Sequence, residues 1–143
     1  MSVKDVNVQI LQDFDWKFTF NHDALEDIVI ALTKLPEEKR SGIARKLLAA
    51  SATYCMASSL KLCLEEKGIK VNSISASSKI QMGKRESGRN IVEIINLNVI
   101  VNIPEENYEG LERCREILEK GSLITRSLKK GIKVNHLISL GNR

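Results

Sequence analysis

The sequence has few cysteines, few aromatic residues and no long hydrophobic run. Its three cysteines are an odd number in a chain of 143 residues. The first 12 residues also lack the continuous apolar core of a signal peptide, so we expect a reduced, intracellular protein rather than a disulfide-stabilised secreted one. No apolar segment approaches the roughly 20 residues that span a bilayer. The sequence therefore predicts a cytoplasmic protein with no membrane partner.

Recognisable cofactor and metal motifs are also missing. The chain has no phosphate-binding loop, no zinc-ligand spacing and no nucleophile elbow, so we predict neither a metal nor a cofactor. Neither His22 nor His136 has ligand spacing with a cysteine, and a core or interface role is expected for His136. The net charge of +4 comes from lysines and arginines scattered among glutamates. This pattern favours a solvated surface over nucleic-acid binding.

The most informative stretch is 47–60, which reads LLAASATYCMASSL and contains no charged residue. As a helix it would cover roughly 21 Å, which is too short to cross a bilayer. It is apolar on most sides, so we expect it to be buried on most sides within a domain. The predicted helix runs from about Ser41 to Lys67, and Gly68 is its expected left-handed cap. Cys55 lies near its middle.

The segment before this helix has the alternation of a β-hairpin. Residues 6–10 and 16–20 each place apolar side chains at every second position, with a turn through 12–15 between them. The aromatic residues of the second strand are expected in the core. Helical spacing of apolar residues then predicts a short helix from Asp23 to about Leu35, with a strand over 28–32 as the alternative.

The segment after the central helix alternates strands and helices. Strands are predicted over 71–82 and 91–103, separated by a glycine-containing turn. Pro104 starts a helix that ends at Lys120–Gly121. Ser122 is expected to cap a short helix through Leu128, and a final strand follows over 132–140. The predicted fold class is α+β, with a long buried central helix.

Two segments in this order resemble the family of osmotically inducible protein C and organic hydroperoxide resistance protein (OsmC/Ohr). The segments are LLAASATYCMASSLKLCLEEKGIKV at 47–71 and LERCREILEKGSLITRSLKKGIKV at 111–134. The resemblance implies a single α+β domain over 1–143 that forms an intertwined homodimer. Residues 1–40 would form a dimerising hairpin and short helix, and residues 41–143 would form the core.

The resemblance also implies a chemistry. Family members reduce organic hydroperoxides with a thiolate, whose sulfenic acid is then captured by a second cysteine. Cys55 falls on the peroxide-attacking cysteine, whereas Ser122 falls on the second cysteine and cannot form a disulfide. Arg45 falls near the position of a family glutamate, which reverses the charge there. The arginine that stabilises the thiolate is therefore Arg40, Arg45 or absent.

The three cysteines also have simpler interpretations. Cys55 could be a small core hydrophobe, since buried free cysteine commonly packs in this way. Cys63 lies eight residues beyond it, about 12 Å along a helix, which is outside disulfide reach within one rigid helix. It could resolve Cys55 only across a dimer. Cys114 falls on an apolar helical stripe, so packing accounts for it.

Three functional hypotheses follow from the sequence. The first is a one-cysteine thiol peroxidase, in which Cys55 reacts with a small organic hydroperoxide and an external thiol reductant regenerates it. The second is a non-catalytic OsmC-like homodimer that binds a small apolar ligand beside Cys55. The third, a basic nucleic-acid-binding α+β domain, is a remote alternative. The first is preferred, with its enzymatic status left open.

Overall fold

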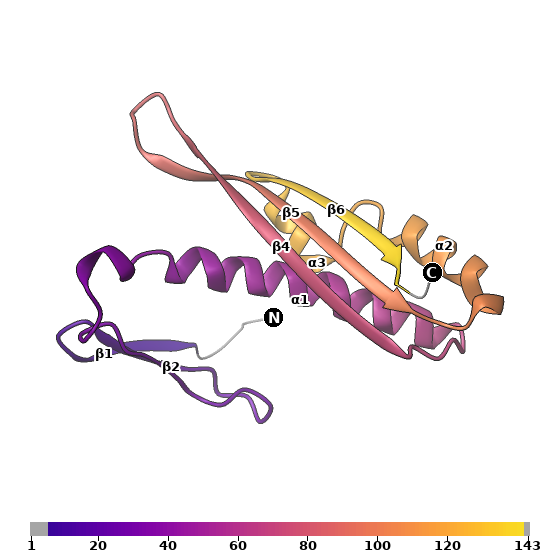
Figure 1. The fold of residues 1–143 in the computed structure, drawn as a ribbon, viewed down its shortest axis with the longest axis horizontal. Coiled ribbons are helices and arrows are strands. Elements are labelled where there is room, and N and C mark those ends of the chain that lie inside the picture. The colour runs from indigo at the N-terminus through magenta and orange to yellow at the C-terminus, as the bar shows by residue number, and fades with distance from the viewer. Residues whose placement is uncertain (1–5, 142–143) are drawn as a thin grey trace. The chain divides into compact units, whose positions relative to one another are not determined.

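The structure of the protein, a computed structural model, describes residues 6–141. These residues form two compact units, with the division between Ile43 and Ala44 (Figure 1). The two units are described separately below.

The amino-terminal unit is a three-stranded antiparallel sheet. Its strands are β1 (Asn7–Gln12), β2 (Asp15–Thr19) and β3 (Ile28–Ile30), in the order β1-β2-β3. The predicted β1–β2 hairpin is confirmed: Val8 pairs with Phe18, and the two-residue turn places Asp13 at a positive φ of 48°. None of the described residues of this unit is buried, so the expected aromatic core is not present in a single chain.

The predicted helix over 23–35 is wrong, and the alternative strand is correct in type. The structure contains the short strand β3, whose Ile30 pairs with Trp16 and whose Ile28 pairs with Phe18. Three consecutive β-branched residues favour a pleated strand over a helix. A short 3₁₀ helix, η1 (Glu37–Lys39), follows after Pro36.

The carboxy-terminal unit contains the long helix and a second sheet. Its elements are α1 (Ile43–Glu66, which begins at the boundary residue), β4 (Ser73–Lys84), β5 (Asn90–Asn102), η2 (Glu105–Asn107), α2 (Tyr108–Ile117), α3 (Leu123–Leu128) and β6 (Lys133–Leu140). The strand order is β4-β5-β6. β4 and β5 pair as an antiparallel hairpin, whereas β6 is parallel to β5, because the chain returns through α2 and α3 before forming β6 (Figure 1).

One face of this sheet carries the hydrophobic core. Alternate residues of β5, from Ile95 to Ile103, point inward as the sequence predicts, and α1, α2 and α3 all contribute side chains against that face. The carboxy-terminal unit is therefore a two-layer arrangement of helices on one side of a sheet. The larger cluster consists of Met56, Leu60, Leu64, Ile69, Val99, Val101, Ile103, Leu111, Cys114, Leu118 and Ile138.

Helix α1 is less buried than expected. Within one chain only Ala52, Met56, Leu60 and Leu64 are buried. They are spaced four residues apart and form one narrow stripe. On other sides of the helix, Tyr54 is 74% exposed and Leu62 is 59% exposed. The reason is that a single sheet covers a single side of the helix. The described residues of the carboxy-terminal unit leave Tyr54 and Leu62 uncovered.

By length and composition, one helical segment could cross a membrane. It spans 37–66 and has a mean hydropathy of 1.4 in its most apolar window. This is weak evidence, because the central helix of a folded domain meets the same criteria. Here the buried stripe of α1 packs against a sheet of the same chain.

Helix ends follow the predicted turn chemistry. Gly68 closes α1 with a φ of +74°, and Gly121 follows α2 with a φ of +100°. Both angles lie in the left-handed region that glycine tolerates best. At Gly121 an added Cβ would also meet the Thr125 side chain. The chain is thereby turned directly into Ser122 and helix α3.

Candidate functional site

Cys55 lies at the side of the buried stripe of α1. It follows Ala52 by three residues and directly precedes Met56, both of which are fully buried. Its own side chain is half-buried, and its thiol is free. The surrounding turn of the helix is rich in small residues, and the hydroxyl of Ser58 donates to the Cys55 carbonyl at 3.3 Å. Cys55 is thus an unbonded, partly accessible thiol on the central helix.

Ser122 is the N-cap of α3, as predicted. Its backbone N–H donates to the Thr125 hydroxyl oxygen at 2.7 Å, and the two hydroxyl oxygens are 3.0 Å apart. Together these contacts form a capping box in which both residues are buried. The position that the resemblance gives to a second cysteine is therefore occupied by a structural cap.

Residues on either side of the Ser122 turn belong to the same hydrophobic clusters as α1 residues next to Cys55. Leu118, before the turn, packs in the same cluster as Met56. Ile124, after the turn, packs against the cluster that contains Ala52. Both positions singled out in the sequence lie in the carboxy-terminal unit.

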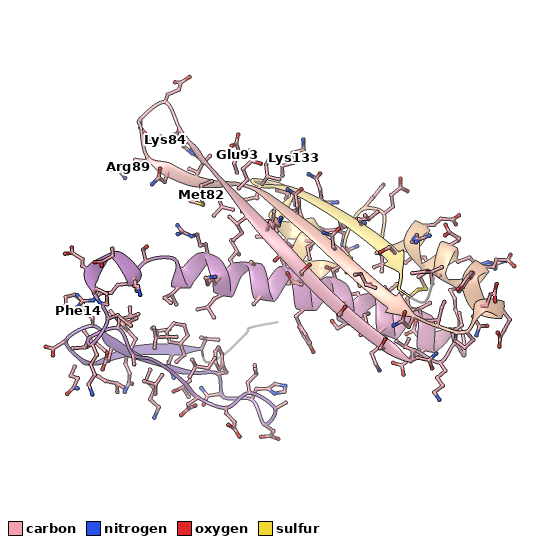
Figure 2. All side chains as sticks on the ribbon, viewed as in Figure 1. Phe14, Met82, Lys84, Arg89, Glu93 and Lys133 are labelled. Carbon is pink, nitrogen blue, oxygen red and sulfur yellow. A yellow bond between two sulfur atoms is a disulfide. The ribbon has the colours of Figure 1, made fainter. Side chains whose placement is uncertain are left out.

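The two candidate arginines have different surroundings. Arg45 is exposed on α1 and precedes Cys55 by ten residues, about 15 Å of helix. Arg40 belongs to the amino-terminal unit. Its guanidinium donates to the carbonyls of Leu35 at 2.9 Å and Thr33 at 3.2 Å and lies over the Phe14 ring, which Figure 2 labels, at 4.5 Å. These contacts hold the 33–40 loop. A role for Arg45 at Cys55 requires the Arg45 of a second chain.

Cys63 and Cys114 form a disulfide, with their Cα atoms 6.0 Å apart. The expectation of a reduced protein is therefore wrong for these two residues. The predicted packing of Cys114 is confirmed, since it is fully buried between Leu111 and Leu118. Packing alone does not account for it, however, because it is also bonded. Cys63 is bonded to Cys114, so it is not available to form a disulfide with Cys55 within the chain.

The two histidines have local structural roles. His136 pairs with Leu97 and shares a face of β6 with the buried Val134 and Ile138, but it is itself only partly buried. Burial, and then the charge of Lys129, lower its pKa below the ordinary value. The Nδ1 atom of His22 accepts the backbone N–H of Ala24 at 2.9 Å. Among residues 6–141, no group of three or more potential metal ligands comes together.

The remaining surface features lie away from Cys55. The tip of the β4–β5 hairpin carries Lys84 and Arg89, with Glu93 of β5 nearby in the strand (Figure 2). Charges of both signs are therefore interleaved there, which does not favour the nucleic-acid alternative. A hollow of about 610 Å³ lies between α2 and β6. Its lining residues are Tyr108, Glu109, Glu112, Arg115, Ser139 and Leu140.

Comparison with known proteins assigns the family. The model of the family described as OsmC-like protein matches residues 44–137, which contain Cys55, the disulfide and Ser122. The chain belongs to the OsmC-like family. The resemblance noted in the sequence is thereby confirmed. No curated protein matches this OsmC-like chain.

Solved structures share the fold across the whole chain. A hypothetical protein from Aquifex aeolicus VF5 is 20% identical, with a TM-score of 0.68, covering 98% of this chain and 96% of that one. An OsmC-like protein from Mycoplasma pneumoniae is 16% identical, with a TM-score of 0.68 and coverage of 96% and 97%. An organic hydroperoxide resistance protein from Elizabethkingia anophelis is 16% identical, with a TM-score of 0.61 and coverage of 99% of both chains.

Proposed function

We propose that this OsmC-like protein reduces small organic hydroperoxides with Cys55 as its only reacting cysteine. The observation that carries the proposal is the distribution of the three thiols. Cys55 is free and partly accessible, whereas Cys63 and Cys114 are bonded to each other. Because Ser122 occupies the second family position, no protein thiol at that position can capture an oxidised Cys55.

The reaction needs two external thiols for each peroxide. The Cys55 thiolate attacks the O–O bond, becomes a sulfenic acid and releases the alcohol after proton uptake. A first external thiol condenses with the sulfenic acid to give a mixed disulfide and water. A second external thiol attacks that mixed disulfide, releases a low-molecular-weight disulfide and restores the Cys55 thiolate. Such a cycle suits a cytoplasmic location, where thiol reductants are abundant.

Several features support the substrate class. The side chains next to Cys55 on the buried stripe, Ala52 and Met56, are apolar and fully buried, so the thiol lies at the edge of an apolar region. Membership of the OsmC-like family points the same way, and structural neighbours include proteins named for organic hydroperoxide resistance. The proposal extends that named property of the neighbours to this chain.

A homodimer is part of the proposal. The amino-terminal unit has no buried residue among those described, although β1 and its turn carry Val8, Ile10, Leu11 and Phe14, each about half exposed. The exposed side of α1 adds Tyr54 and Leu62. A second copy of the chain, which offers the same apolar surfaces, would cover both in an intertwined interface. It would also provide a second Arg45 or Arg40 for the Cys55 thiolate.

Peroxide consumption with a thiol reductant tests the catalytic proposal. The wild type should consume an organic hydroperoxide catalytically in the presence of excess dithiothreitol, and Cys55→Ser should reduce the rate to that of the reductant alone. The matched control is Cys63→Ala/Cys114→Ala, which keeps Cys55 and should remain active while folded. Full activity of Cys55→Ser would overturn the proposal. A folded wild type that consumes no peroxide would rule out the peroxidase and favour the non-catalytic protein that binds a small apolar ligand.

Light scattering tests the homodimer. The wild type should have twice the mass of one chain at micromolar concentration. Substituting Ile10→Asp on β1 should weaken the dimer, because it places a charge in the proposed interface, whereas Lys79→Asp on the other sheet should not. A stable wild-type monomer at micromolar concentration would contradict the proposal.

A further inference from the structure

The Cys63–Cys114 disulfide joins two helices that are distant in sequence. Cys63 lies on α1 and Cys114 on α2, 51 residues further along the chain. Their Cα separation of 6.0 Å lies within the normal range for disulfides, so the backbones need not move for the bond to form. The packing of α2 on α1 therefore places the two sulfurs together.

The two sides of the bridge differ in accessibility. Cys114 is fully buried, whereas Cys63 is only partly buried at the edge of the cluster. A reductant from solvent therefore approaches through Cys63. The thiolate of the reductant would attack the Cys63 sulfur and form a mixed disulfide with it. The bond to Cys114 would break, and the Cys114 sulfur would leave as a thiolate that takes up a proton.

The packing around the bridge does not depend on the covalent bond alone. Leu111 and Leu118, which flank Cys114 on α2, are buried in the same cluster as Leu60 and Leu64 of α1. The guanidinium of Arg115 also donates to the Ile138 carbonyl of β6 at 3.0 and 2.7 Å. Helix α2 is thus held to the core by apolar and polar contacts, which remain after the bridge is reduced.

We propose that Cys63 and Cys114 form a reversible thiol–disulfide couple, a second redox site distinct from Cys55. Two external thiols reduce the bridge to two protein thiols and are themselves oxidised to one disulfide. A low-molecular-weight disulfide such as oxidised glutathione re-forms the bridge by the reverse exchange. The oxidised form locks α2 onto α1, and the reduced form keeps the fold with α2 held less tightly.

This couple works independently of Cys55. Cys63 lies eight residues from Cys55 on the same helix, about 12 Å along its axis, which is beyond disulfide reach. A bridge between them within one chain would require α1 to unwind. The redox state of the couple can therefore change while the Cys55 thiol stays free.

Equilibration of Cys55→Ser protein with glutathione tests the couple. Mixtures from fully reduced to fully oxidised glutathione, read out by alkylation and mass spectrometry, should convert the pair between two alkylated thiols and one disulfide in both directions. Circular dichroism should show the same secondary structure throughout. The hydrogen-exchange rate of the α2 amides should rise on reduction. A rise of roughly 30- to 1,000-fold corresponds to the stabilisation that a disulfide closing a long loop typically provides.

A single-cysteine variant tests the route of attack. In Cys55→Ser/Cys114→Ala, oxidised glutathione should attach to Cys63 in the folded protein, because that side is partly exposed. In the matched variant Cys55→Ser/Cys63→Ala, the buried Cys114 should react at least tenfold more slowly. Persistence of the bridge in millimolar reduced glutathione, or loss of the fold on reduction, would overturn the proposal. Neither result depends on whether Cys55 reduces peroxides.

Discussion

The two halves of α1 differ in their surroundings. The first half, 43–55, has one buried residue, Ala52, and ends with the free thiol of Cys55. The second half, 56–66, buries Met56, Leu60 and Leu64 in the larger cluster, and a disulfide joins it to α2. The second half is therefore anchored on the sheet, whereas the first half is held by Ala52 and the partly buried Leu48 and carries a free, partly accessible thiol.

The anchoring side chains and the proposed reacting thiol therefore lie in different halves of one helix. Large apolar side chains and a covalent bond lie where the helix must be fixed. Small residues are frequent around the thiol that we propose as the reacting group. The predictions below test this division, beginning with the largest expected effect.

Matched leucine substitutions should distinguish the two halves most strongly. Leu60→Ala removes a fully buried side chain from the larger cluster and should lower the free energy of unfolding by about 2–5 kcal/mol. Leu48→Ala removes a partly buried leucine from the first half and should cost less than about 2 kcal/mol. Urea unfolding of both variants measures the difference, and equal losses would contradict it.

Cysteine substitutions should show the same asymmetry. Without a reductant, Cys63→Ala/Cys114→Ala should lower the free energy of unfolding by about 2–4 kcal/mol, because the bridge no longer restricts the unfolded chain. Cys55→Ala should change it by less than about 1 kcal/mol, since Cys55 is unbonded and half-buried. Adding a reductant should destabilise the wild type but not the double variant. A larger loss of unfolding free energy in Cys55→Ala than in the double variant would contradict this prediction.

Removing the cap of α3 should have an intermediate effect. Ser122→Ala deletes the hydroxyl that faces the Thr125 hydroxyl at 3.0 Å and should cost about 0.5–2 kcal/mol. The control is Ser127→Ala on the same helix, whose exposed hydroxyl donates to the Leu123 carbonyl; it should cost less than about 0.5 kcal/mol. Thermal unfolding of the two variants compares them. Similar losses would show that Ser122 is not a significant cap.

The smallest effect concerns His136. Its pKa in the folded protein is lowered by burial and then by Lys129, so the unfolded chain takes up a proton first as pH falls. Stability from this group is fully present above pH of about 6.5 and should decline as pH falls below that value. Arg115 and Glu119 line the same hollow as His136.

The corresponding measurement is the free energy of unfolding between pH 7.5 and 5. His136→Gln, which does not titrate, should show a shallower decline than the wild type. Lys129→Gln should retain most of the wild-type decline, because burial is the larger cause. If the free energy of unfolding fell equally steeply with pH in His136→Gln and in the wild type, His136 would not be the cause of the decline.

Local patterns in the sequence predicted local structure well. Ser122, Gly121 and Gly68 mark helix ends through bonds and backbone angles set within a few residues. The alternation over β5 likewise identified its buried face. The predicted helix over 23–35 failed because its spacing was ambiguous, and the pairing of Ile30 with Trp16 decided in favour of a strand. That pairing depends on a strand 14 residues away.

Long-range contacts were not predictable in the same way. The sequence placed Cys63 on the central helix and Cys114 on an apolar stripe of a second helix, but it did not show that α1 and α2 pack with these residues adjacent. The parallel pairing of β6 with β5 was likewise invisible, because it depends on the path of the chain through α2 and α3. The position of Cys55 on the central helix was predictable from the family segment around it.

Mass spectrometry of the wild type after treatment with an organic hydroperoxide tests the central claim most directly. We predict that Cys55 is oxidised to sulfenic and then sulfinic acid, that the Cys63–Cys114 bridge stays intact, and that no disulfide contains Cys55. Ser122→Cys should instead trap Cys55 as a disulfide, if the turn after Gly121 brings position 122 beside it. A Cys55–Cys63 or Cys55–Cys114 disulfide in the wild type, or an unoxidised Cys55, would contradict the one-cysteine mechanism.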